Sequence, residues 1–222
     1  MEIMIDHTLK ELCPDFKIGV VTYENIHVSD SPQMLKGRLQ LFQESLYFDY
    51  LDKKVTEIPA INEWRKLFKL VGTDPNRYRP SNEALYRRVQ KQHFLTNVNS
   101  AVDMNNFLSL QYQIPLGIYD YDHLVGENIS IKIGTSSDTY VALNERDIVL
   151  TNKILSQDQQ GPFGSPFVDS KRSAVTSSTV NAIHLIYFQP SLHNNDANQL
   201  LQTLSKMFTQ IHGGDATYKV IS

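Results

Sequence analysis

The sequence has little cysteine, no long apolar run and no excess of basic charge, and each absence excludes a class of protein. Cys13 is the only cysteine among 222 residues, which excludes an intramolecular disulfide and a multi-cysteine metal site. No window approaches the ~20 apolar residues needed to cross a bilayer. Glu2, Asp6 and Glu11 stand where a signal peptide needs basic and apolar residues. We therefore expect a cytoplasmic protein that does not bind membranes.

The charge balance limits how the chain can bind nucleic acid. The formal net charge is −3, whereas a protein that coats DNA or RNA by bulk charge must neutralise many phosphates. No DNA partner is predicted, and any contact with RNA must come from a local basic surface. The sequence also has no P-loop, no dinucleotide-binding glycine pattern, no HExxH and no GxSxG motif, so no cofactor is predicted.

The organisation of the chain favours one compact domain over residues 1–222. Apolar residues make up 41% of the sequence and charged residues 20%, as in ordinary globular proteins. There is no repeat and no glycine- or proline-rich linker. The only boundary that the pattern suggests divides an N-terminal extension or subdomain, residues 1–59, from a main part, residues 60–222.

Hydrophobic periodicity predicts helices before strands. Helical spacing follows Ser31-Pro32 and Pro59, and a strand rich in β-branched residues precedes them at Lys17 to Val28. After Leu116 the period changes to two. Further segments are predicted as strands at 129–133, 139–143, 147–150 and 182–188, and as a closing helix at 195–211. This order predicts an α+β fold.

A basic segment stands out in this acidic chain. A helix that starts at Ser81 carries Leu85 and Val89 on one face and its cations on the other. The candidate RNA- or phosphate-binding residues are Arg77, Arg79, Arg87, Arg88 and Lys91. A solvated helix face without a ligand explains the same pattern, so both interpretations stay open.

Polar residues also interrupt a mostly apolar helix that begins at Ser100. Asp103 and Asn106 lie on one face with Phe107 and Leu110, and buried polar groups must be hydrogen-bonded or line a cavity. Asp103 can equally tie down loop backbone, so Asn106 is the better pocket candidate. His184, in a buried strand, is favoured as a satisfied core histidine over a general base. Asp120, Asp122 and His123 form a cluster that could bind a metal ion.

These segments carry a resemblance to a known family. The strings VDMNNFLSL and PLGIYDYDHLVG are similar to the pattern Val-Asp-x-x-Asn-Tyr, then Pro-Leu-His-x-Phe-Asp, of the tRNA-editing domain (B3/B4-type) in the beta subunit of bacterial phenylalanyl-tRNA synthetases. The string RYRPSNEAL, followed by paired arginines, resembles stand-alone members of the family. The resemblance runs from about residue 60 to residue 188. It implies a strand end and turn, and not a metal site, at Asp120, Asp122 and His123.

The resemblance implies a sandwich-like, β-rich core flanked by helices, with a pocket for the aminoacylated 3′ end of tRNA. Hydrolysis of a mischarged ester there needs a positioned water and donors to the oxyanion, which the glycine loop 161–164 could supply. A trans-editing deacylase is therefore expected, although the chain cannot charge tRNA itself. The implied pocket residues are Asp103, Asn106, Gly117, Gly161, Gly164, Thr176, Thr179 and His184.

The chain departs from the family pattern at two pocket positions. Gly117 replaces the histidine of Pro-Leu-His, and the glutamate that senses a hydroxyl group falls at or near Leu185. The resemblance then implies a pocket of different selectivity. The alternative is a non-enzymatic module that binds RNA or a small amino-acid-like ligand.

Overall fold

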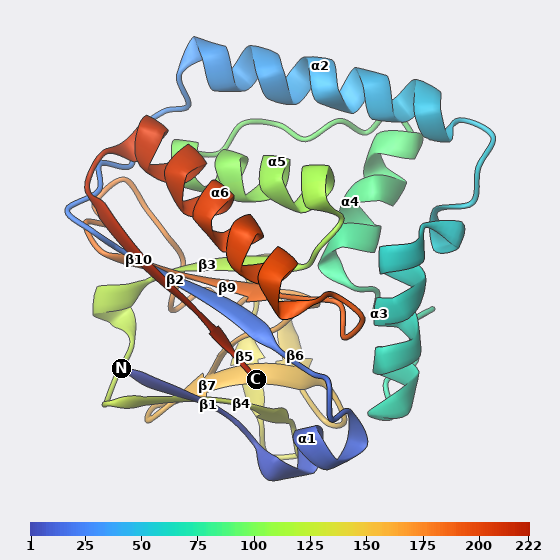
Figure 1. Cartoon of the computed structure of the whole chain (residues 1–222), viewed down its shortest axis with the longest axis vertical. Coiled ribbons are helices and arrows are strands. Elements are labelled where there is room, and N and C mark those ends of the chain that lie inside the picture. Colours follow the sequence, from blue (N-terminus) through green and yellow to red (C-terminus); the bar gives the residue numbers. More distant parts are fainter.

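The computed structural model describes residues 1–222 and contains two four-stranded sheets (Figure 1). Sheet A has the strand order β1-β4-β7-β8 and sheet B has the order β10-β2-β9-β3. A small two-stranded sheet pairs β5 with β6. The strands are β1 (Glu2–Ile5), β2 (Ile18–Glu24), β3 (Leu116–Asp120), β4 (Asn128–Ile133), β5 (Thr139–Val141), β6 (Asp147–Val149), β7 (Ile154–Asp158), β8 (Gly161–Gly164), β9 (Ala182–Tyr187) and β10 (Asp215–Ile221).

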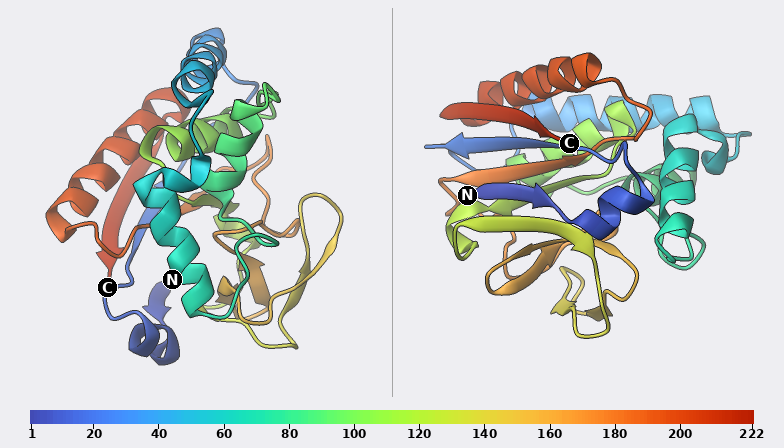
Figure 2. Two further views of the ribbon diagram at one scale, coloured as in Figure 1. Left: turned by 90° about the vertical axis from the view of Figure 1, so that its right-hand side faces the viewer. Right: turned by 60° about the horizontal axis from the view of Figure 1, so that its bottom comes forward.

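The helices lie mainly on one face of sheet B (Figures 1 and 2). They are α1 (His7–Leu12), α2 (Gln33–Tyr50), α3 (Pro59–Leu70), α4 (Ser81–Gln90), α5 (Ser100–Tyr112) and α6 (Asn194–His212), with short 3₁₀ helices at Val55–Glu57 and Tyr121–His123. Helices α5 and α6 cover the sheet, and α2 packs on α4 and α5 from outside. The α+β class and the sandwich-like, helix-flanked core predicted from the sequence are confirmed.

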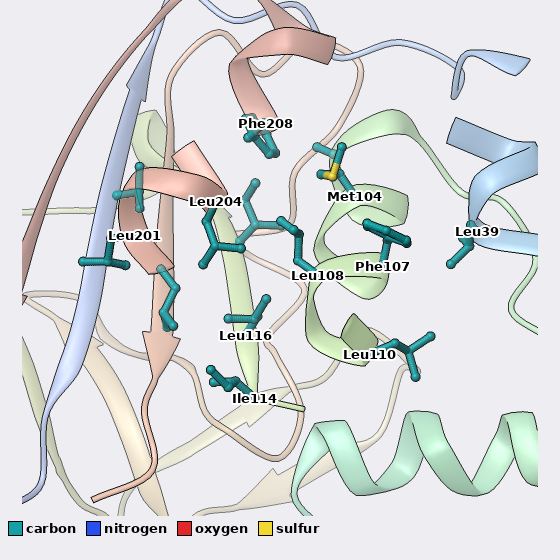
Figure 3. Packing of buried hydrophobic residues seen from close by; sticks show 14 of the residues in the cluster. Leu39, Met104, Phe107, Leu108, Leu110, Ile114, Leu116, Leu201, Leu204 and Phe208 are labelled. Atoms are coloured by element: carbon teal, nitrogen blue, oxygen red, sulfur yellow. The ribbon is translucent and has the colours of Figure 1, made fainter. Parts of the chain in front are cut away.

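Two apolar cores hold these layers together. The first lies between the helices and sheet B, where Leu108 of α5 lies beside Leu204 of α6 and Phe107 lies toward Leu39 of α2 (Figure 3). The second lies between the two sheets and includes Trp64 of α3, whose ring meets Tyr187 of β9 at 6.2 Å. Trp64 is fully buried, as its place on the apolar stripe of α3 predicts.

The first 59 residues take part in both sheets. β1 pairs in parallel with β4, and β2 pairs with β9 and β10 in the middle of sheet B. The sequence analysis predicted no strand at β1, β7 or β10. No helix of the chain combines the length and the apolar character that a membrane-crossing segment requires.

Candidate functional site

The predicted pocket residues lie on both faces of sheet B. Side chains alternate between the faces along a strand, so His184 of β9 faces the helices while its neighbour Leu185 faces sheet A. Gly117 of β3 pairs with Leu185 in the antiparallel register and shares its face. The sheet therefore separates His184 from Gly117.

Asp103 lies under the N-terminal end of α5 and is fully buried. Its carboxylate accepts hydrogen bonds from Ser31 Oγ at 2.5 Å, Asn97 Nδ2 at 2.8 Å and the Val98 N–H at 2.9 Å. These bonds fix the loops before α2 and α5. This arrangement matches the backbone-anchoring role left open in the sequence analysis.

His184 is the polar centre of the helix side. Its Nε2 lies 2.9 Å from Asn105 Oδ1, and its Nδ1 lies 3.5 Å from the Tyr23 hydroxyl. Burial lowers the pKa of His184 to about 3, so the ring is neutral at physiological pH. The residue of α5 that contacts it is Asn105, while Asn106 beside it is half-buried.

Between the sheets, the space beside Gly117 and Gly164 is occupied by Tyr119. A Cβ atom at either glycine would overlap the Tyr119 hydroxyl. That hydroxyl donates to Asp169 Oδ1 at 2.6 Å, and the Ser165 N–H donates to the same oxygen at 3.3 Å. The two glycines therefore make room for the buried Tyr119 ring, whose hydroxyl reaches the half-buried Asp169.

The Asp169 carboxyl has an altered affinity for protons. Burial raises its pKa to about 7, against the opposing effects of the bonds from Tyr119 and Ser165. Both bonds end on Oδ1, which leaves Oδ2 as the oxygen able to take a proton. A carboxyl that is half ionised near neutral pH suits general acid–base chemistry.

Thr179 and Thr176 lie at the end of β3 rather than beside Asp169. Thr179 Oγ1 donates to Asp120 Oδ2 at 2.5 Å and accepts from the Thr176 N–H at 3.0 Å. Thr176 Oγ1 lies 2.8 Å from Ser178 Oγ. These bonds close the turn that leads into β9.

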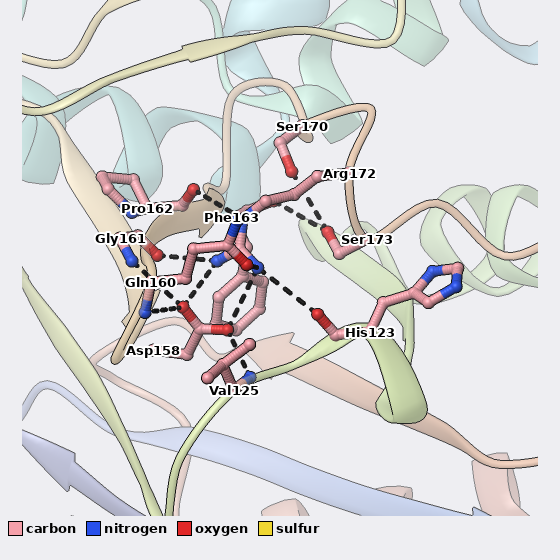
Figure 4. Close-up of polar contacts among 10 residues, drawn as sticks. All are labelled: His123, Val125, Asp158, Gln160, Gly161, Pro162, Phe163, Ser170, Arg172 and Ser173. Atoms are coloured by element: carbon pink, nitrogen blue, oxygen red, sulfur yellow. Dashed lines mark hydrogen bonds and ion pairs between the residues drawn. The ribbon is translucent and has the colours of Figure 1, made fainter.

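Gly161 and Gly164 bound a strand, so the expectation of a glycine loop is wrong. Residues 161–164 form β8, which pairs with β7. The Gly161 N–H donates to Asp158 Oδ1 at 3.1 Å, and Arg172 Nη2 reaches the same oxygen at 2.6 Å (Figure 4). Because Gly161 has φ +132 and its N–H is already bonded, its role here is the tight turn between β7 and β8.

The predicted basic residues divide into exposed and engaged groups. Arg77, Arg79, Arg88 and Lys91 are exposed. Arg87 instead pairs with the fully buried Glu83, its Nε lying 2.8 Å from Oε1. Arg65 of α3 binds the other oxygen of Glu83 at 2.9 Å. Arg87 therefore also compensates a buried carboxylate.

An aromatic ring gathers further cations next to this segment. Arg77 lies over the Tyr78 ring at 5.2 Å, and Lys153 Nζ lies 3.9 Å from the same centroid. Burial, with the charge of Arg77 adding to it, lowers the pKa of Lys153. The Tyr78 ring meets Phe167 edge-on at 5.3 Å. We call Arg77, Tyr78, Lys153 and Phe167 the basic-aromatic cluster.

The basic-aromatic cluster adjoins the loop that carries Asp169. Phe167 is two residues before Asp169, and the Ser81 N–H at the start of α4 donates to the Pro166 carbonyl at 2.8 Å. The segment 165–169 thus carries the carboxyl of raised pKa and also contacts the segment that carries the exposed cations. We take this combination as the candidate site.

Sequence reasoning missed several members of this site. Lys153 and Phe167 come from segments without a motif, and Tyr119 reads as an ordinary strand aromatic. The glycines offered the usable signal, because Gly117 inside a strand indicates a close approach by another group. No group of three or more His, Cys, Asp or Glu side chains is arranged to hold a metal ion.

The family model described as "B3/4 domain" matches residues 63–210. The uncharacterized protein YhzB of Bacillus subtilis is 36% identical over 217 residues, which cover 98% of each chain. The phenylalanine–tRNA ligase beta subunit of Staphylococcus haemolyticus is 31% identical over 93 residues, which cover 39% of this chain and 11% of that subunit.

Other similarities are more distant. The corresponding subunit of Oceanobacillus iheyensis is 24% identical over 191 residues, which cover 81% of this chain and 22% of that subunit. An N-terminal fragment of the phenylalanyl-tRNA synthetase beta subunit from Pyrococcus horikoshii aligns at a TM-score of 0.49 with 11% identity, covering 100% of this chain and 54% of the fragment. The chain thus spans only a small part of the ligase subunits that it matches.

Proposed function

The chain belongs to the B3/4 domain family, and on that premise we propose that it hydrolyses the ester of mischarged aminoacyl-tRNA in trans. Its sequence is related to the phenylalanine–tRNA ligase beta subunits. The observation that carries the proposal is the contact between the basic-aromatic cluster and the loop of Asp169. One part of this site suits a phosphate chain and the other suits proton transfer.

The exposed cations serve the RNA contact in this proposal. Arg77, Arg79, Arg88 and Lys91 project from one continuous segment, and each contact with a phosphate releases bound counterions. Because the net charge of the protein is −3, the attraction is local and orients the tRNA toward this surface. Arg87 contributes less, because Glu83 already neutralises it.

Asp169 serves the chemical step. Oδ2 of the ionised carboxylate takes a proton from a water molecule as that water attacks the ester carbonyl carbon. The tetrahedral intermediate then expels the ribose oxygen of tRNA, which takes the proton back from Asp169. The products are free amino acid and uncharged tRNA, and no cofactor is needed. Tyr119 orients the carboxyl group through Oδ1.

The test is a panel of aminoacyl-tRNAs, correctly charged and mischarged, followed by loss of the ester. At least one mischarged member should lose its amino acid faster than in buffer. Asp169→Asn should lower kcat by about 10²- to 10⁴-fold, the usual contribution of general acid–base catalysis, and leave KM nearly unchanged. If no member of the panel is hydrolysed faster than in buffer, the hydrolase proposal fails.

Replacement of exposed cations tests the RNA contact separately. Arg79→Ala and Arg88→Ala should weaken tRNA affinity and each reduce the salt slope by about 1. Lys206→Ala, an exposed change on α6, is the matched control and should leave affinity unchanged. Arg87→Ala is avoided because it also uncovers the buried Glu83. Equal affinity for all variants would contradict the assigned surface.

A binding module without catalysis is the second candidate. It is favoured by Gly117 and Leu185, which pair across β3 and β9 and place no polar side chain where the family pattern has histidine and glutamate. Salt-sensitive tRNA binding with no ester loss for any substrate would select this function. A thermal shift with a free amino acid, without any effect of tRNA, would instead select a small-ligand module.

A further inference from the structure

The two large sheets leave a cavity between two of their edge strands. β1 is an edge strand of sheet A, β10 is an edge strand of sheet B, and the two strands contact each other. The cavity has a volume of about 320 Å³, which is at the small end of the range for ligand sites. Neither Tyr119, Asp169 nor any residue of the basic-aromatic cluster lines it. It is therefore distinct from the candidate site described above.

Strand register directs a row of side chains into this cavity. Thr217 of β10 pairs with Thr22 of β2, which pairs in turn with Ile183 of β9. Ile183 belongs to the core between the sheets, and so does Val20, two residues before Thr22. Side chains two residues apart share a face, so both threonines project toward sheet A. Two hydroxyl groups thus stand beside apolar neighbours.

The polar groups of the cavity are hydrogen-bond donors that the chain itself does not use. The hydroxyls of Thr22 and Thr217 form no hydrogen bond within the chain, with each other or with any other group. The Met1 nitrogen donates to the Tyr121 hydroxyl at 2.8 Å, which leaves the hydroxyl hydrogen of Tyr121 free to donate. Lys219 forms no ion pair and is the only charged side chain among the lining residues. The cavity therefore favours an anion.

We propose that this cavity binds a small organic carboxylate with an apolar body. The carboxylate accepts hydrogen bonds from Lys219 and from the hydroxyls of Thr22 and Thr217, and bonds of this charge-assisted kind are the stronger ones. The apolar body lies against the side chains of Ile3 and Ile183, which are buried between the sheets. No acid lines the cavity, so an ammonium group on the ligand finds no partner there.

Probes that share one ring and differ in the head group test this assignment. In an amide NMR titration of the full chain, phenylacetate should bind with a dissociation constant on the order of 0.1–1 mM. Phenylacetamide should bind at least about tenfold more weakly, because it carries no charge, and phenethylamine should not bind. Equal affinities for phenylacetate and phenylacetamide would overturn the assignment of an anion.

The same titration locates the ligand. The amide signals of Thr22, Ile183 and Thr217 should shift first, because these residues form the row that lines the cavity. Shifts confined to other parts of the chain would exclude this cavity. An aliphatic acid, 4-methylpentanoate, checks that the result does not depend on the aromatic ring. The absence of any shift with both acids at about 10 mM would overturn the proposal and leave Lys219 as a charge that discourages strand pairing.

Substitution of the lysine tests the source of the affinity. Lys219→Met keeps an unbranched side chain and removes the charge, so it should weaken phenylacetate binding by at least about tenfold and leave phenylacetamide unaffected. Because Lys219 is exposed, the variant should fold. Lys206→Met, the same change on an exposed position of α6, is the matched control and should bind like the parent protein. Unchanged phenylacetate affinity in Lys219→Met would contradict the proposed contact.

A threonine variant and an amino acid complete the test. Thr217→Val removes one hydroxyl at nearly constant shape and should weaken phenylacetate binding by about fivefold. Free phenylalanine carries an ammonium group as well as a carboxylate, so it should bind more weakly than phenylacetate. Tighter binding of phenylalanine would refute the assignment of the head group. None of these measurements involves tRNA or ester hydrolysis, so their outcome is independent of the proposed function.

Discussion

At the scale of single residues, the most consequential group is the Tyr119 hydroxyl. It lies within the space that Gly117 and Gly164 leave open, and it donates to Asp169. The family pattern has histidine where this chain has Gly117. A side chain at that position cannot coexist with the present position of the Tyr119 ring, so the glycine and the tyrosine–aspartate pair depend on each other.

We expect Gly117→Ala to destabilise the fold by about 1–3 kcal/mol, because the added Cβ overpacks the space held by Tyr119. Gly117→His should destabilise the fold more, because the imidazole ring needs more of the space that Tyr119 holds. Chemical denaturation measures both changes. The matched control is Gly37→Ala. Its added Cβ meets only open space, and the higher helix propensity of alanine should raise the free energy of unfolding by roughly 0.5–1 kcal/mol. An unchanged midpoint for Gly117→Ala would contradict the crowding argument.

The raised pKa of Asp169 also predicts how stability depends on pH. The folded-state pKa is about 7, above the ordinary value of 3.8, so the unfolded chain ionises first. The contribution of this residue to stability is complete below pH 3.8 and is lost as pH rises through 7.

Asp169→Asn stays neutral and should therefore gain stability relative to the parent protein as pH rises. The expected relative gain between pH 5 and pH 8 is about 2.6 kcal/mol at most, from the pKa difference. Urea denaturation of both proteins at the two pH values measures it. If the two proteins show the same pH dependence, the carboxyl is not desolvated as described.

At the scale of elements, the position of α4 depends on a buried carboxylate. Glu83 accepts Arg65 from α3 and Arg87 from its own helix, and its side chain is fully buried. This network fixes the direction of the exposed cations Arg88 and Lys91. It also explains why a helix with a basic face is a poor guide to function when taken alone, since one of its arginines is structural.

Glu83→Gln should cost about 3–5 kcal/mol, because Arg65 and Arg87 lose their buried partner. Thermal unfolding measures the loss. Glu57→Gln is the matched control, since Glu57 forms an exposed pair with Lys54 that should contribute under ~1 kcal/mol. Equal effects of the two substitutions would contradict the assigned anchoring role.

Periodicity predicted the strongly patterned elements and missed those that depend on distant partners. The apolar spacing of α2, α3 and α6 and the alternation of β4 are local signals. β10 is mostly exposed and offers no apolar alternation, so only its pairing with β2 defines it. β1 is a short strand whose partner β4 lies more than a hundred residues away.

The candidate site was less predictable for the same reason. The cations of the segment 77–91 are neighbours in sequence, so their grouping is visible there. Tyr119 and Asp169 lie 50 residues apart, and only the packing of β3 against the loop after β8 joins them. Asn105 and Asn106 are adjacent in sequence, but the direction of each side chain depends on the orientation of α5 against β9.

At the scale of the whole molecule, residues 1–59 are built into both sheets through β1 and β2. We propose that the chain is one cooperative unit, and that the boundary near residue 60 does not divide separable domains. Residues 60–222 expressed alone should not fold, because sheet B loses a central strand. Calorimetry of the whole chain should show a single transition. A folded 60–222 fragment would contradict this view.

The place of β2 also determines when the protein can fold during its synthesis. β2 leaves the ribosome before most of the strands, yet its neighbours β9 and β10 follow every strand of sheet A. Its apolar residues must wait for nearly the whole chain, and loops of this length close slowly. Nascent chains therefore expose this strand to chaperones and to other nascent chains until β9 and β10 have been made, and the yield of native protein should depend on that interval.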